Sequence, residues 1–263
     1  MVRAVRPLKR NCNVGCPLLS LHIQGGLGRA TTLTTLRERT RLDQTPAHDI
    51  HNPQLLQLMP TTARTVVEVG CSSGALAREY KKVNSLCRYI GVEVVPEYVP
   101  LAQRYCDSVI EVDIERVDEA YLRESLQGDC WIFGDTLEHL VDPWALLSRI
   151  RAVLSTDGCI IACIPNAQHW SVQVRLNCGV FRYEQSGLMD RSHLRWFTRT
   201  TIMEMFQQSG FRVVEGITRV FEDPMMDKVM PTIKLMASNA GGNPEVAAQD
   251  ARVFQYIIRA VPA

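Results

Sequence analysis

The sequence predicts an α/β protein built on a mostly parallel sheet, and three observations support this fold class. Short apolar segments recur between residues 65 and 135, each ends in an acidic residue, and stretches with helical patterns separate them. The acids are Glu68, Glu93, Asp113 and Asp135, at intervals of 20 to 25 residues. Strands that alternate with helices at this spacing are typical of repeated βα units.

The most informative pattern lies between residues 65 and 77. A strand rich in β-branched residues is predicted at 65–69, followed by a tight turn with Gly70 and Gly74 and a helix that begins near Gly74. Glycine lets a backbone approach a ligand closely, because no Cβ intervenes. Glu68 places a carboxylate at the carboxyl end of the strand, the edge where open parallel sheets bind ligands.

The remaining elements are predicted in chain order. Asn52 and Pro53 form the start of a short helix, with asparagine as the N-cap and proline at the first position. Helices are expected at 52–59, 143–154 and 200–209, and further strands at 88–93, 109–115, 130–135, 159–164, 211–215 and 252–261. The sheet therefore has seven expected strands.

The turn and the acids downstream of it resemble class I S-adenosylmethionine (SAM)-dependent methyltransferases, over roughly residues 48–262. The resemblance implies a Rossmann-like sheet with helices on both faces and its last strand antiparallel, and SAM as the cofactor. An acid at the end of the second strand would bind the ribose hydroxyls, and an acid followed by an apolar residue would hold the adenine. The residues expected to bind the cofactor are Glu68, Gly70, Cys71, Gly74, Glu93, Val94, Asp113, Ile114 and Asp135.

Composition is ordinary for a soluble enzyme. The chain is 46% hydrophobic with a formal net charge of +1, and it has no run of about 18 apolar residues that would predict a membrane span. A charge near zero without a basic tract argues against nucleic acid as a partner. Cysteines inside predicted strands favour a reducing compartment, so we expect a cytoplasmic protein. Cys12 and Cys16 lack a second pair at zinc spacing, which argues against a structural metal.

The chain is expected to have two parts. Residues 1–45 contain no acid before Glu38 and are expected to be a disordered or non-core extension, with an organelle transit peptide as the alternative. Residues 46–263 are expected to form the methyltransferase domain, with a lid insertion at 165–199 and a second insertion at 221–250. Methionines in the second insertion suggest a helix with an apolar face. That face could cover a substrate, contact a second subunit or form part of the core. We therefore expect either a monomer or a homodimer.

Two histidines are the candidate catalytic residues. Methyl transfer needs an aligned nucleophile and, for a hydroxyl or ammonium group, a base; His139 follows the fourth strand, where such a base is expected. His193 in the lid is the second candidate. The alternatives are that Glu138 and His139 support the loop, and that His193 ties the lid to the core. The spacing from Asp135 to His139 also resembles the divalent-metal motif of small-RNA 3′-end and ubiquinone-pathway O-methyltransferases, with His193 as a further ligand. Because Asp135 replaces the usual glutamate, we expect no metal.

The predicted lid is rich in arginine and tryptophan and resembles bacterial methyltransferases of sugar, glycan and natural-product pathways. The residues expected to bind the substrate are Asn166, His169, Trp170, Arg195 and Trp196. Arginines here favour a phosphate or carboxylate on the acceptor, such as a nucleotide-linked sugar, although a solvated surface is the alternative.

The predicted function is methylation of an oxygen or nitrogen of a small molecule, a sugar or a secondary metabolite. An RNA-end or metal-assisted O-methyltransferase and a non-catalytic SAM-binding subunit are alternatives. A nicotinamide-dependent reductase is a further alternative. The glycine loop of such an enzyme would have a third glycine at position 76, where this chain has Leu76.

Overall fold

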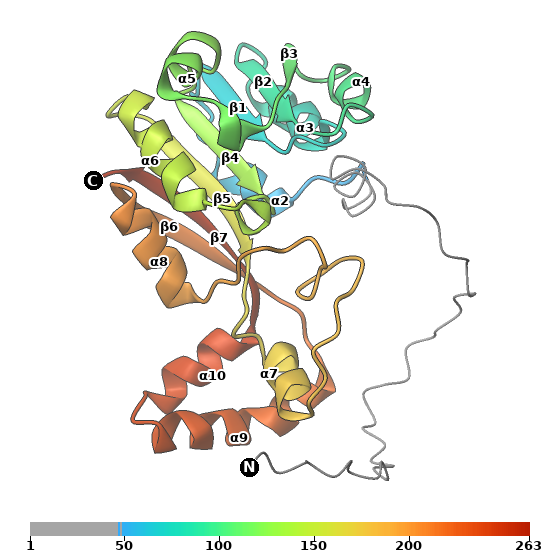
Figure 1. Cartoon of the computed structure of the whole chain (residues 1–263), viewed down its shortest axis with the longest axis vertical. Helices are drawn as coiled ribbons and strands as arrows, with labels where there is room; N and C mark the ends of the chain where they lie inside the picture. The colour runs from blue at the N-terminus through green and yellow to red at the C-terminus, as the bar shows by residue number, and fades with distance from the viewer. Residues whose placement is uncertain (1–46, 48) are drawn as a thin grey trace, which may run out of the picture.

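The computed structural model describes residues 47 and 49–263, which contain a seven-stranded sheet in the order β3-β2-β1-β4-β5-β7-β6 (Figure 1). Its strands are β1 Thr65–Val69, β2 Arg88–Glu93, β3 Ser108–Glu111, β4 Cys130–Gly134, β5 Cys159–Pro165, β6 Phe211–Val220 and β7 Val253–Pro262. Strands β1 to β5 pair in parallel, whereas β7 lies antiparallel between β5 and β6. The predicted α/β fold with an antiparallel last strand is therefore confirmed.

Helices cover both faces of the sheet. Successive residues of a strand point to opposite faces, and Val66 packs in one core while Val67 packs in the other. Helices α2 Pro53–Leu58, α3 Ala75–Val83 and α4 Val99–Ala102 cover the first face. Helices α5 Glu119–Ser125, α6 Pro143–Val153 and α8 Arg199–Gln208 cover the second, together with the 3₁₀ helix η1 Ile114–Arg116. The four central strands are buried on both faces, as expected of a parallel sheet.

A smaller group of helices lies at one end of the sheet, at the bottom of Figure 1. It comprises α7 Trp170–Asn177, α9 Pro224–Asn239 and α10 Pro244–Arg252. The expected methionine-rich helix is α9, and its Met226, Met230 and Ile233 pack against Trp170 of α7. Leu235 of the same helix is exposed. The apolar face of α9 is therefore narrower than its composition suggested.

Two strands differ from their predicted bounds by more than one residue. β3 ends at Glu111, and the Asp113 carboxylate instead accepts a hydrogen bond from the Glu115 amide and caps η1. β6 continues to Val220 rather than ending at 215. As the edge strand it buries little of itself, so its sequence mixes apolar with charged residues and lacks the continuous apolar run that identifies a central strand.

The expected extension at 1–45 falls outside the described residues, so the division of the chain into two parts stays a prediction. Among the described residues, no helix has the length and apolar character that crossing a membrane requires.

Candidate active site

The candidate site lies where the connections of the sheet diverge. β1 pairs with β2 on one side and with β4 on the other, and ligands of open α/β sheets bind at such a switch point. Two non-glycine residues have positive φ: Ser72 (φ 48°), in the turn after β1, and Asp135 (φ 54°), directly after β4. Backbone strain of this kind concentrates at functional sites. The Thr136 hydroxyl donates to the Val69 carbonyl at 3.0 Å, so the two turns are joined.

The β1–α3 turn requires both of its glycines. Gly70 and Gly74 have φ of 74° and 76°. The Gly70 and Cys71 amides donate to the Val92 carbonyl at 2.8 and 3.2 Å, which holds the turn against β2. A Cβ on Gly74 would lie 3.0 Å from the Cα of Ala102.

Glu93 lies beside this turn, as predicted from its place at the end of β2. Its carboxylate accepts hydrogen bonds from the amides of Ser72, Val94 and Val95 at 2.8, 2.9 and 3.0 Å. The side chain of Val94, by contrast, is half exposed. Glu93 therefore joins the β1–α3 turn to the loop after β2, and its contact with ribose stays a prediction.

Glu68 occupies a different environment from the one expected at an open edge. It is buried, and its Oε2 accepts a hydrogen bond from the Tyr89 hydroxyl at 2.8 Å. Burial raises the pKa of Glu68 to about 8. Glu68 is thus predominantly neutral near pH 7, and its interaction with a cofactor stays a prediction.

The acids that follow β3 and β4 are both held by neighbouring groups. Asp113 pairs with Arg116 at 2.9 Å, while Ile114 packs into the core. Asp135 Oδ1 accepts hydrogen bonds from Gln255 Nε2 and from Cys163 Sγ, the latter at 3.5 Å. The Gln255 contact spans 120 residues, so no local signal in the sequence predicted it.

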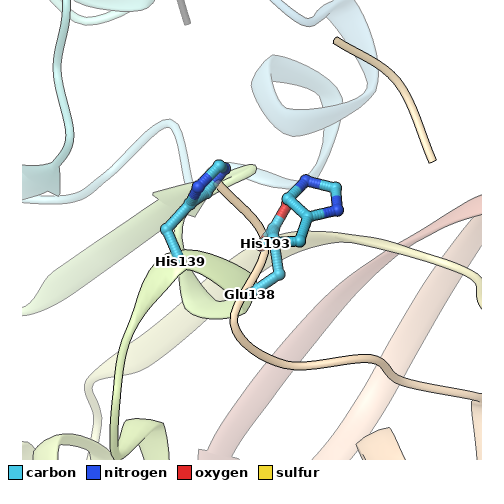
Figure 2. A group of neighbouring side chains, drawn as sticks. All are labelled: Glu138, His139 and His193. Carbon is cyan, nitrogen blue, oxygen red and sulfur yellow. The ribbon is translucent and has the colours of Figure 1, made fainter. Parts of the chain in front are cut away.

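Glu138 and the two candidate catalytic histidines form one cluster (Figure 2). Glu138 and His139 belong to the 3₁₀ helix η2 Leu137–His139, and His193 comes from the segment between α7 and α8. One potential ligand atom from each residue lies within 4.8 Å of the others. His193 Nε2 is 4.0 Å from Glu138 Oε1, and the two imidazole rings meet edge to face. The structure thus brings together residues 54 positions apart in the sequence.

The histidines are neutral at pH 7. Burial lowers the pKa of His139, and burial followed by the proximity of His139 lowers that of His193 to about 4. His139 Nδ1 lies 3.2 Å from the Ser192 carbonyl oxygen, which can only accept a hydrogen bond. The proton of the neutral ring therefore belongs on Nδ1, and Nε2 keeps a lone pair that can take a proton or bind a metal.

Glu138 is fully buried, and neither of its carboxyl oxygens has a hydrogen-bond partner among the described residues. Burial, reinforced by the charge of Asp135, raises the pKa of Glu138 well above its usual range. A buried carboxylate without partners is unfavourable, so the group is either protonated or neutralised by a cation.

The predicted substrate residues lie in different surroundings. Trp196 lies beside His193, with ring centroids 5.9 Å apart. Arg195 instead attaches the segment between α7 and α8 to η2 and the loop after it: its amide donates to the Glu138 carbonyl at 3.0 Å and its Nε to the Val141 carbonyl at 2.9 Å. His169, the N-cap of α7, and Trp170, its first residue, are both buried. The ring of His169 lies 5.5 Å from those of Trp170 and Phe254.

Asn166 has a structural role in this arrangement. It is fully buried, its Nδ2 donates to the carbonyls of Asp250 and Val253 at 2.8 Å, and its Oδ1 accepts from the Gln168 amide at 3.0 Å. The side chain ties the end of β5 to the junction of α10 and β7. Any contact of Asn166 or His169 with substrate stays a prediction.

Comparison with known proteins defines the class. Residues 38–216 match a family model described as a methyltransferase domain, and this match covers more than half of the chain. The chain therefore belongs to this methyltransferase family. Its cofactor is S-adenosylmethionine, as the turn and the acids predicted.

Individual relatives are distant. A ubiquinone biosynthesis O-methyltransferase from Cereibacter sphaeroides is 22% identical over 167 residues, which cover 62% of this chain and 66% of that protein. The magnesium protoporphyrin IX methyltransferase from Synechocystis, solved with bound SAH, has a TM-score of 0.51 and 14% identity, covering 80% of each chain. A chain solved in complex with the Haloferax volcanii Trm112 methyltransferase activator has a TM-score of 0.52 and 19% identity, covering 80% of this chain and 87% of that one. These structural matches establish the fold.

Proposed function

We propose that this protein transfers the methyl group of SAM to an oxygen or nitrogen of a small molecule, a sugar or a secondary metabolite. The observation that carries the proposal is the pair of neutral imidazoles, His139 and His193, beside the strained turn that follows β4. We further propose that it works in the cytoplasm, where buried free thiols such as Cys130 and Cys159 remain reduced.

The chemistry requires little of the protein beyond alignment and proton removal. SAM, when bound, supplies a methyl group on a sulfonium leaving group. In this proposal the lid and η2 hold the acceptor in line with the breaking carbon–sulfur bond, and the acceptor atom forms the new bond to carbon. His139 Nε2 takes the proton of the acceptor, because its lone pair is available and Ser192 fixes its tautomer.

A second candidate function is metal-assisted O-methylation. Glu138 favours it, because both buried carboxyl oxygens lack hydrogen-bond partners among the described residues and two imidazoles lie beside them. Two imidazoles and a carboxylate suit a divalent transition metal or zinc. Asp135, the first acid of the metal motif in the sequence, contacts Gln255 and lies outside the cluster. If the methylation is metal-assisted, His139 and His193 would bind the metal, and neither would remove the proton of the acceptor.

Mass-spectrometric screening of candidate acceptors for a gain of about 14 Da would identify the substrate class of this SAM-dependent enzyme. With an acceptor identified, His139→Ala should lower kcat by about 10²–10⁴-fold if His139 is the base, while SAM affinity stays unchanged. His51→Ala, at a histidine before α2, is the matched control. Equal turnover by His139→Ala and the control would refute the catalytic role.

Chelation separates the two candidates. Undiminished turnover in EDTA supports His139 as the base and rules out the metal. Loss of turnover that Mg²⁺, Mn²⁺ or Zn²⁺ restores supports the metal; Glu138→Gln should then also reduce the metal content measured by mass spectrometry. Absence of both SAM-dependent turnover and SAM binding would overturn both.

A further inference from the structure

Five aromatic side chains form a continuous series that starts at the candidate catalytic pair. His139 and His193 have ring centroids 4.8 Å apart, and Trp196 follows His193 at 5.9 Å. Phe181 lies 5.7 Å from Trp196, and Tyr183 lies 5.6 Å from Phe181. We refer to Trp196, Phe181 and Tyr183 as the ring row. Its spacings are those of interacting aromatic pairs.

The ring row leads from the interior to the surface. The side chain of His193 is 7% exposed, Trp196 is half-buried, and Phe181 and Tyr183 are 45% and 61% exposed. Phe181 and Tyr183 are therefore surface residues rather than part of the hydrophobic core. Exposed apolar groups that gather in one place, rather than being scattered singly, mark a binding site.

The backbone holds this row in a fixed position relative to the histidines. The amides of Leu194 and Arg195 donate to the Glu138 carbonyl at 2.8 and 3.0 Å, so the segment that carries Trp196 is attached to η2. Trp196 also packs against a small apolar cluster that includes Leu188 and Met189. A group bound along the row would thus have a defined distance to His139.

Two arginines near the row are engaged within the protein. Arg175 pairs with Glu184 at 2.6 Å, and the Arg195 guanidinium donates to the Val141 carbonyl. Two of the arginines that suggested an anionic acceptor are therefore engaged within the protein. The row itself offers aromatic surface to a ligand, and the exposed Arg182, between Phe181 and Tyr183 in the sequence, leaves a positive charge in the same segment.

We infer that the ring row is the acceptor subsite and that it takes a flat ring system carrying the reacting hydroxyl or amine at one end. This inference rests on the proposed function, since it places the reacting group at His139 and the rest of the acceptor along Trp196, Phe181 and Tyr183. The planes of neighbouring rings stand at 51° to 90° to one another, so a flat ligand would meet the row through ring faces and ring edges in turn. Contact with several rings favours a fused or extended aromatic acceptor over a single ring or a sugar.

Binding can be measured without turnover by titrating ligands into the full chain saturated with S-adenosylhomocysteine. The probes are phenol, a naphthol and hydroxypyrene, with methyl glucoside as the non-aromatic comparison. Affinity should rise with the number of fused rings. Phe181→Ala and Tyr183→Ala should each weaken hydroxypyrene binding by roughly two- to tenfold and leave phenol binding unchanged.

Matched variants separate ring loss from general damage. Tyr183→Phe keeps the ring and should bind hydroxypyrene like the wild type, and Leu86→Ala removes an exposed apolar side chain elsewhere and should have no effect. Melting temperatures of all variants should agree within a few degrees, because Phe181 and Tyr183 are exposed.

Three outcomes would overturn the subsite: equal affinity for all three ring sizes, tighter binding of methyl glucoside, or Tyr183→Ala shifting only the sedimentation of the protein. The last result would make the row a contact between copies of the chain. Ring-dependent binding without methylation of any acceptor would support the subsite and overturn the proposed function.

Discussion

Gly74 offers a direct test of the cofactor turn through Gly74→Ala. The backbone at Gly74 has φ of 76°, which costs an L-residue about 1–2 kcal/mol. The new Cβ would also lie 3.0 Å from the Cα and 3.1 Å from the oxygen of Ala102, backbone atoms at the end of α4 that cannot rotate away. Overpacking of this kind costs about 1–3 kcal/mol. The free energy of unfolding should therefore fall by about 2–5 kcal/mol.

Gly241 provides a matched control, since its φ is 77° and a Cβ there would meet no atom within 4 Å. Gly241→Ala should lower the free energy of unfolding by about 1–2 kcal/mol, and the difference between the variants isolates the contact with Ala102. Urea denaturation gives both values, and calorimetric titration should show weakened SAM binding in Gly74→Ala alone. Equal destabilisation, or unchanged SAM affinity in Gly74→Ala, would refute the role assigned to the turn.

Three further predictions concern buried polar groups. The pKa of Glu68 is about 8 in the folded protein, whereas its ordinary value is 4.5. Between these two pH values the folded state keeps a proton that the unfolded state releases, so the stability of the fold decreases as pH rises. Glu68→Gln should therefore raise the melting temperature more at pH 8 than at pH 5; the opposite order would contradict the buried neutral acid. His193 has its pKa lowered from 6.5 to about 4, so the unfolded state binds the extra proton and stability is lost as pH falls between these values. His193→Asn should reduce the fall in melting temperature between pH 6.5 and pH 4. The same fall in the variant and the wild type would contradict the lowered pKa of His193. Asn166→Ala should cost about 2–4 kcal/mol in urea denaturation, because three hydrogen bonds of a buried amide disappear. Asn177→Ala, at an exposed helix position, should stay within about 0.5 kcal/mol, and equal costs would refute the structural role of Asn166.

Much of the fold could be predicted from the sequence, because its central strands are buried on both faces and their apolar runs are continuous. Asn52 and Pro53 marked the start of α2, since capping is a local property. The extent of β6 could not be predicted in this way. Its strand structure depends on hydrogen bonds to β7, because its sequence has no continuous apolar run, and that pairing joins residues up to 51 positions apart.

The sequence indicated which residues belong to the candidate site, but it did not indicate which of them contact one another. His139 and His193 were recognisable by residue type and position. Their approach, however, depends on the amides of Leu194 and Arg195, which donate to the Glu138 carbonyl. The structural role of Asn166 comes from carbonyls 84 and 87 residues away, which leave no pattern near position 166. The ring row was hidden for a similar reason, because spacing in an irregular segment does not reveal which rings meet.

Calorimetric titration of SAM into the wild type and Glu93→Ala tests the central claim most directly. The wild type should bind one SAM per chain and show no binding of NADH. Glu93→Ala should lower SAM affinity by about tenfold or more, since hydrogen bonds to a charged group contribute about 1.5–3 kcal/mol. Glu97→Ala, which removes an exposed acid in the next loop, should bind SAM like the wild type. Absence of SAM binding, or equal affinity in Glu93→Ala and Glu97→Ala, would contradict a SAM pocket at the ends of β1 and β2.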